Sequence, residues 1–141
     1  EKVLPHVFEI SMGIDRSLYT ILEHSLKKDK EHERMVLSLK PYLSPVHVGI
    51  LSLVKKDGLK EKTDEIFLNI KRKFDAFLDH SGAIGRRYRR LDEIGAPFAI
   101  TVDHQTLEDN TVTIRKRDSM EQSRVNISEI DSILSGSVAF P

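Results

Sequence analysis

The sequence predicts an α/β protein in which helices pack on a mixed β-sheet. Beyond residue 45, apolar residues recur at helical spacing in some segments and alternate with polar residues in others. The resulting order of elements is β-α-β-α-β-β-β-α. Hydrophobic residues make up 39% and charged residues 31% of the 141 residues, a composition typical of a globular chain with one core.

Residues 1–45 form a separate part of the chain in this prediction. Alternation over 6–11 predicts a short strand, and helical spacing of apolar residues predicts a helix from 14 to about 26. The charged stretch 27–34 is expected to be a solvated loop. Pro41 and Pro45 exclude a helix or a central strand. We therefore place a domain boundary here, which divides the chain into residues 1–45 and 46–141.

The second part contains five expected strands and three expected helices. The apolar run 46–54 predicts a strand covered on both faces. The later strands alternate, so one face of each is expected to be exposed, and a loop containing the turn residues Glu108, Asp109 and Asn110 is expected between them. Asn126 and Glu129 predict a helix that starts with a capping box. The strands are expected over 46–54, 76–78, 98–103, 111–117 and 122–125, and the helices over 59–74, 84–94 and 126–134.

The composition excludes several kinds of chemistry. The chain has no cysteine, which excludes disulfides, thiol catalysis and cysteine-bound zinc. Its six histidines lack metal-ligand spacing, so no metal site is expected. Basic and acidic residues both number 22, so the net charge does not indicate a nucleic-acid partner. No apolar run approaches the roughly 20 residues of a membrane span. Because the chain starts without Met, we expect further sequence upstream.

The predicted helix 84–94 carries a cluster of arginines around Tyr88. Four guanidinium groups lie between residues 86 and 90, and a phosphate backbone is a suitable partner for them. The alternative is a solvated helix face that Asp92 and Glu93 partly balance, and the residues alone favour this alternative.

The predicted strands 98–103 and 111–117 carry polar residues at every second position. With Val112 and Ile114 in the core, these side chains face outward and are suited to hydrogen bonding with the bases of a single-stranded RNA loop. The alternative is an ordinary polar sheet surface, which periodicity alone favours. The outward positions are Thr101, Asp103, Thr111, Thr113, Arg115 and Arg117.

Residues 81–98, SGAIGRRYRRLDEIGAPF, closely resemble the anticodon-binding domain of archaeal- and eukaryotic-type glycyl-tRNA synthetases. The resemblance continues through 100–103 (ITVD), 106–109 (TLED) and 111–124 (TVTIRKRDSMEQSR). Residues 7–16, VFEISMGIDR, resemble motif 3 of these class II enzymes. The matches keep their order and cover residues 5–132.

The resemblance implies a five-stranded mixed sheet flanked by three helices for residues 46–141. A strand-helix remnant of a catalytic domain would precede it. The implied activity is that of a glycine–tRNA ligase, for which ATP, together with Mg, is a substrate. The implied enzyme is a homodimer in the cytoplasm and, in a eukaryote, also in mitochondria. Its partners are glycine, ATP and tRNA(Gly). Since motifs 1 and 2 are missing, we expect this chain alone to be inactive and monomeric, to hold no cofactor and to bind tRNA weakly.

The resemblance also implies roles for individual residues near the N-terminus. Arg16 is the expected catalytic residue, which contacts an ATP phosphate, and Gly13 belongs to the same ATP site. Glu9 and Ser11 are expected to hold the amino group of glycine. Two positions depart from the family pattern, with Ile10 in place of Pro, and with Asp15 in place of Gly beside Arg16.

For the tRNA, the resemblance favours base reading by the polar sheet face. Glycine tRNAs have cytosine at the second and third anticodon positions, and a carboxylate with an arginine can read cytosine. The expected anticodon contacts are Thr101, Asp103, Thr113, Arg115, Arg117 and Asp118, and the expected backbone contacts are Arg86, Arg87, Arg90 and Arg124. One alternative is a non-catalytic module of this fold, such as a polymerase accessory subunit or a regulatory tRNA sensor. Another is a small α/β domain whose basic helix binds an acidic protein.

Overall fold

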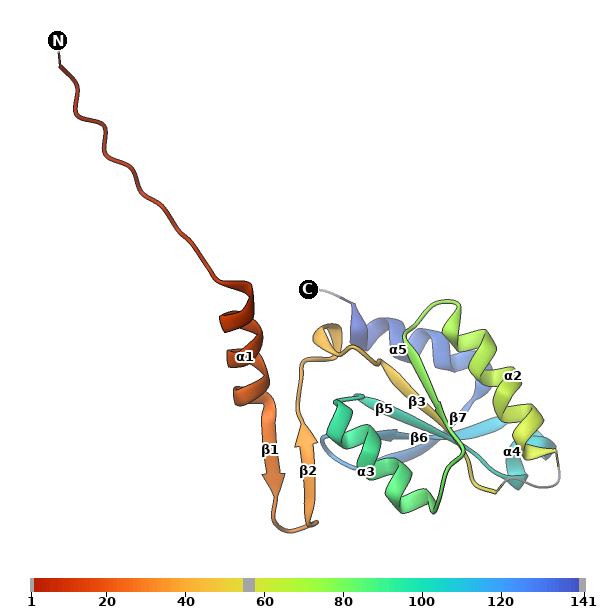
Figure 1. The fold of residues 1–141 in the computed structure, drawn as a ribbon. Coiled ribbons are helices and arrows are strands. Elements are labelled where there is room, and N and C mark those ends of the chain that lie inside the picture. The colour runs from red at the N-terminus through yellow and green to blue at the C-terminus, as the bar shows by residue number, and fades with distance from the viewer. Residues whose placement is uncertain (1, 55–57, 140–141) are drawn as a thin grey trace.

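The computed structural model of the protein describes residues 2–54 and 58–139. Residues 2–13 have no regular secondary structure and extend away from the rest of the chain (Figure 1). The predicted strand over 6–11 is therefore wrong, and no strand lies beside this segment within the described residues. The predicted helix is confirmed as α1 (Ile14–Ser25), but all of its residues, including the apolar ones, are at least partly exposed.

A two-stranded antiparallel hairpin follows α1. It consists of β1 (Leu26–Asp29) and β2 (Arg34–Leu37), with Leu26 opposite Leu37. The expectation of a solvated loop over 27–34 is wrong. The reason is that Arg34 is buried and finds carboxylate partners both within the hairpin and on a helix far along the chain. A short 3-10 helix, η1 (Pro41–Leu43), lies at the predicted domain boundary, which itself remains a prediction.

The predicted five-stranded mixed sheet is confirmed. Its spatial order is β4-β3-β5-β6-β7. The first three strands in this order are parallel, and the other two are added antiparallel. The strands are β3 (Val48–Ser52), β4 (Ala76–Asp79), β5 (Phe98–Val102), β6 (Thr111–Lys116) and β7 (Gln122–Asn126).

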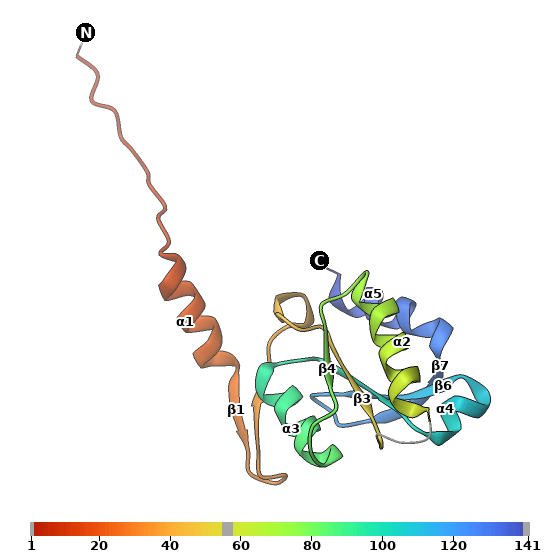
Figure 2. The ribbon, with the colours of Figure 1, turned by 45° about the vertical axis from the view of Figure 1, so that its right-hand side comes forward.

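The predicted helices cover both faces of the sheet (Figures 1 and 2). The inner face packs against α2 (Leu59–Lys71) and α5 (Ile130–Val138), which together with β3, β5 and β6 form the larger apolar core. The outer face packs against α3 (Ile84–Ile94), through a smaller core of Leu51, Leu91 and Ala99. Both faces of β5 are buried as a result, so the exposed face expected for 98–103 is wrong.

A further short helix, which was not predicted, lies between β5 and β6, where a loop was expected. This helix, α4 (His104–Asp109), begins with a capping box in which the Asp103 carboxylate accepts from the Thr106 backbone N–H, and the Thr106 hydroxyl accepts from that of Asp103. The predicted capping box of Asn126 and Glu129 is confirmed, and it opens the 3-10 helix η2 (Ile127–Glu129) that leads into α5. None of the described helices combines the length and apolar character needed to cross a bilayer.

Candidate nucleic-acid interface

The outer face of the sheet is covered unevenly. The helix α3 packs over β3 and β5, whose residues are all buried. On β6 and β7 the outward residues Thr111 and Thr113 are half-buried, while Gln122 and Arg124 are exposed. An open polar surface therefore exists, but it is confined to these last two strands and to the end of β5, where Asp103 lies. We call this surface the outer shelf.

An arginine–aspartate pair is the main electrostatic feature of the outer shelf. Arg124 donates from its two terminal nitrogens to the two carboxylate oxygens of Asp103, over 2.7 and 2.9 Å, and from Nε to the Thr111 hydroxyl over 2.6 Å. Hydrogen bonding from Arg124 lowers the pKa of Asp103 to about 2, and the same contact raises the pKa of Arg124. Both groups are therefore charged at neutral pH and held in fixed positions.

Two further predicted anticodon contacts, Thr101 on β5 and Thr113 on β6, lie directly opposite each other on neighbouring strands. Thr113 is half-buried on the shelf, 3.5 Å from a terminal nitrogen of Arg124. Thr101 is buried, contrary to the prediction, because Tyr88 of α3 lies over it with their hydroxyl oxygens 2.6 Å apart. Thr101 thus anchors α3 and does not offer its hydroxyl to a ligand.

The prediction that Arg115 and Arg117 face an open surface is wrong, since they are only 6% and 2% exposed. Arg115 donates to both oxygens of Asp92 on α3, over 2.9 and 3.2 Å, and lies 5.0 Å from the Tyr88 ring centre. Arg117 donates to the backbone oxygens of Gly95 and Leu39 over 2.7 and 2.8 Å. The helix and the segment before η1 cover this end of the sheet.

Asp118, another predicted anticodon contact, is exposed at the end of β6. It accepts hydrogen bonds from Arg117 and from the Ser38 hydroxyl, and the bond from Arg117 lowers its pKa. Asp118 therefore lies beside the covered end of the sheet, apart from the Asp103–Arg124 pair at the other end of β6.

The arginines of α3 divide into bound and free groups. Arg87 is 4% exposed and donates to the Ser52 carbonyl over 2.5 Å, and burial lowers its pKa. Arg90 is held by Asp79 and by the Ser81 carbonyl. Arg87 and Arg90 were expected to contact the tRNA backbone, but both are already hydrogen-bonded within the protein. Arg86 and Arg89 are exposed, and neither side chain has a hydrogen bond or ion pair among the described residues.

The candidate catalytic residues lie in the N-terminal segment. Glu9, Ser11, Gly13 and Arg16 are all exposed, and Gly13 is the N-cap of α1. Residues 11–16 line one shallow hollow of about 790 Å³, which brings three of the four together, without Glu9. The described residues contain no group of three or more acidic, histidine or cysteine side chains that would hold a metal ion. The glycine- and ATP-binding roles remain predictions.

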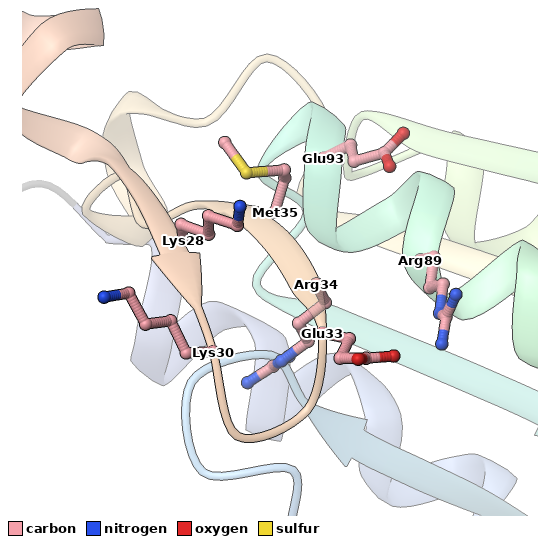
Figure 3. Close-up of a pocket in the computed structure, with 7 residues that line it drawn as sticks. All are labelled: Lys28, Lys30, Glu33, Arg34, Met35, Arg89 and Glu93. Atoms are coloured by element: carbon pink, nitrogen blue, oxygen red, sulfur yellow. The ribbon is translucent and has the colours of Figure 1, made fainter.

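One surface was not predicted from the sequence. A hollow of about 400 Å³ lies between the β1–β2 hairpin and α3, and the basic residues Lys28, Lys30 and Arg89 line it (Figure 3). The only sequence signal was the density of lysines in 27–30. It gave no indication of the hollow, because the folding of this stretch against α3 depends on Arg34 and its partner Asp92, 58 residues away.

The relatives of the chain are synthetases. It is 51% identical over 137 residues to the glycine–tRNA ligase of Archaeoglobus fulgidus, an alignment that covers 94% of this chain and 24% of that protein. It is 50% identical over 147 residues to that of Methanothrix thermoacetophila, which covers 99% of this chain and 26% of the relative. The chain thus spans about a quarter of the length of these relatives. The sequence resemblance to glycyl-tRNA synthetases is confirmed.

Solved structures share the fold at lower identity. The RNA-binding domain of threonyl-tRNA synthetase from Cryptosporidium parvum superposes with a TM-score of 0.67 and 22% identity, over 74% of this chain and 26% of that one. Prolyl-tRNA synthetase from the same organism superposes with a TM-score of 0.64 and 24% identity, over 72% of this chain and 23% of that one. A family model described as the anticodon binding domain matches residues 47–136, which include every strand of the five-stranded sheet. The chain therefore belongs to the anticodon-binding domain family.

Proposed function

We propose that this chain is the anticodon-binding end of a glycine–tRNA ligase, which activates glycine with ATP and joins it to tRNA(Gly). The observation that carries the proposal is the identity of about one half across nearly the whole chain to glycine–tRNA ligases. The similarity includes the N-terminal segment, which lies outside the family match at 47–136.

The outer shelf has the groups that cytosine requires. A carboxylate accepts from the exocyclic amine of cytosine, and a guanidinium or hydroxyl donates to its ring acceptors. Asp103 and Thr113, which are expected anticodon contacts, lie side by side with Arg124, which was expected to contact the RNA backbone. Oδ1 of Asp103 accepts from Thr106 and from Arg124, whereas Oδ2 accepts only from Arg124, so Oδ2 keeps a lone pair with which to accept from a base. A rigid sheet holds all three, which favours the reading of bases that an RNA loop has unstacked.

The remaining predicted roles belong to the same proposal. Glu9 and Ser11 hold the amino group of glycine, and Gly13 and Arg16 contact ATP, which is a substrate used with Mg. The Arg16 side chain is exposed and has no ion pair within the part of the chain that the structure describes, so its charge is available to a phosphate. Residues 1–45 then belong to the catalytic domain of a cytoplasmic homodimer. Catalysis requires the rest of the protein.

A non-catalytic module, such as a polymerase accessory subunit or a regulatory tRNA sensor, is not favoured, because the relatives at about 50% identity are glycine–tRNA ligases. The test uses the longer protein that contains this chain and measures glycine-dependent exchange of pyrophosphate into ATP, followed by charging of tRNA(Gly). We expect exchange with glycine and not with alanine or serine, and loss of exchange in the Arg16→Gln variant. Anticodon binding without any exchange would favour the non-catalytic module.

A further inference from the structure

The hollow between the hairpin and α3 has a neutral and firmly held floor. Arg34 donates to Asp29 over 2.9 Å, to Asp92 over 2.8 Å and to the Arg117 carbonyl over 3.1 Å. Asp92 also accepts from Arg115. Arg34, which lines the hollow, thus belongs to a balanced network of two guanidinium groups and two carboxylates that links β2 to α3 and to β6. The charge of Arg34 is not available to a ligand.

The rim carries three cations with no internal partner. Lys28 and Lys30 come from the hairpin and Arg89 comes from α3, on opposite sides of the hollow (Figure 3). All three are exposed, and within the described residues none of them has an ion pair. Lys28 lies on β1, and Lys30 is the first residue of the turn that follows this strand. Their spacing suits a ligand with several separated negative charges.

Two carboxylates on the same rim narrow the choice of ligand. Glu33 and Glu93 also line the hollow and are exposed. Acidic groups repel a small, densely charged anion, but they accept hydrogen bonds from hydroxyl groups. A backbone in which phosphates alternate with ribose 2′-hydroxyls satisfies both kinds of group on the rim.

The hollow adjoins the outer face of the sheet. Arg89 follows Tyr88 and precedes Asp92 by three residues, and these two residues contact Thr101 of β5 and Arg115 of β6. An RNA stem that leaves a loop held on the outer shelf would therefore pass beside this side of α3.

We propose that the hollow between the β1–β2 hairpin and α3 binds the ribose–phosphate backbone of the anticodon stem, with Lys28, Lys30 and Arg89 on phosphates. This inference rests on the proposed function, because it needs the loop of the same RNA to occupy the outer shelf. On this proposal the β1–β2 hairpin contributes directly to the RNA-binding surface, although it precedes residues 47–136, which match the family model.

The test compares a triple variant, K28Q/K30Q/R89Q, with a control, K60Q/K71Q/R72Q. The control removes the same charge from exposed residues of α2 and its C-cap, on the inner face of the sheet. The probes are the anticodon stem-loop of glycine tRNA and the same loop as a single-stranded oligonucleotide. Affinities for the whole chain are measured by fluorescence anisotropy at several salt concentrations. For the stem-loop, the triple variant should bind roughly tenfold more weakly, and its salt slope should fall by about one for each phosphate that the protein no longer neutralises.

The single-stranded loop separates a stem contact from general attraction. We expect the triple variant and the control to bind it equally, and the control to bind the stem-loop much as the native chain does. An equal weakening with both probes, or an equal effect of both triple variants, overturns the stem contact. If the native chain still prefers the glycine anticodon in that case, the proposed function stands and only this inference fails. If the native chain binds no RNA, both fail.

A second arm tests the ribose contact. Glu33 has a left-handed backbone with φ of 47°, which Asn tolerates well, so Glu33→Asn removes the carboxylate and keeps the local fold. We expect binding of the ribose stem to weaken by about tenfold or more, the size of one charge-assisted hydrogen bond, and no change for a stem made of 2′-deoxyribose. An equal effect on the two stems contradicts the ribose contact.

Discussion

Arg124 on β7 and Asp103 at the end of β5 are joined by two hydrogen bonds, of 2.7 and 2.9 Å, across the intervening strand β6. The carboxylate of Asp103 also caps α4, because it accepts from the backbone N–H of Thr106 over 3.1 Å. One side chain therefore orders a helix end and the outer shelf together. This double role makes the pair sensitive both to pH and to mutation.

The pair predicts a loss of stability in acid. The folded state lowers the pKa of Asp103 to about 2, from an ordinary value of 3.8. A carboxylate with a depressed pKa contributes stability that is fully present above its unfolded value and is lost as the pH falls towards the folded value. The difference in melting temperature between the native chain and Asp103→Ser should therefore shrink from pH 4 to pH 2. Serine keeps a helix cap, so a difference that is constant with pH would contradict the ionic contribution.

The buried network predicts a large loss of stability without a loss of specificity. Arg115→Met leaves Asp92 with Arg34 as its remaining charged partner, and breaking a buried ion pair costs about 3–5 kcal/mol. Because Arg115 does not reach the shelf surface, the preference for the glycine anticodon should remain. Urea unfolding and RNA competition measure the two effects. The control is Lys116→Met, which removes an exposed pair with Glu121 and should cost less than about 1 kcal/mol. Equal costs for the two variants would refute the account of the network.

The packing of α3 on the sheet predicts opposite outcomes for two glycines. A Cβ on Gly49 would lie 2.2 Å from a methyl carbon of Leu91, so Gly49→Ala should destabilise the fold by about 1–3 kcal/mol, the usual cost of overpacking. Gly85 lies within α3 and has nothing within 4 Å of such a Cβ. Gly85→Ala should stabilise by about 0.5–1 kcal/mol. Thermal unfolding of both variants tests this, and a destabilised Gly85→Ala would contradict the open space at that position.

The N-terminal segment is predicted to be the least protected part of the chain. Residues 2–13 form no regular hydrogen-bonded structure, and α1 buries none of its residues. Helices without tertiary packing are marginal in water. Amide hydrogens of residues 2–25 should exchange quickly, while those of β3 and β5, which are buried on both sides, should be strongly protected. Equal protection of the two regions would show that this segment has a partner.

Much of the fold was predictable because its signals are local. Periodicity identified the five strands and the helices α2, α3 and α5, and Asn126 and Glu129 identified the capping box before α5. The short helix α4 replaces the predicted loop because Asp103 and Thr106 form a capping box, although Asp109 and Asn110 are turn residues. The partner of Arg34 was not predictable from a local pattern, because it lies 58 residues away.

The site was less predictable, because alternation shows which face a residue is on and not whether that face is covered. Thr101 and Arg115 lie on the outer face, as predicted, yet α3 covers both. Arg87 was expected to bind RNA and instead donates to a strand carbonyl, while Arg89 has no such partner among the residues that the structure describes. Which of these nearby arginines is free depends on the rotation of α3 over the sheet. That rotation is set by packing, which no local pattern records.

The most direct test of base reading by the outer shelf is a binding competition between two anticodon stem-loops. One carries cytosine at the second and third anticodon positions, and the other carries uridine there. The native chain should prefer cytosine by about tenfold or more, the value of one good base contact. Asp103→Ser should bind both RNAs with nearly equal affinity, since it removes the acceptor for the cytosine amine and keeps the cap of α4. Equal affinities for the native chain, or a preference that survives Asp103→Ser undiminished, would contradict the account.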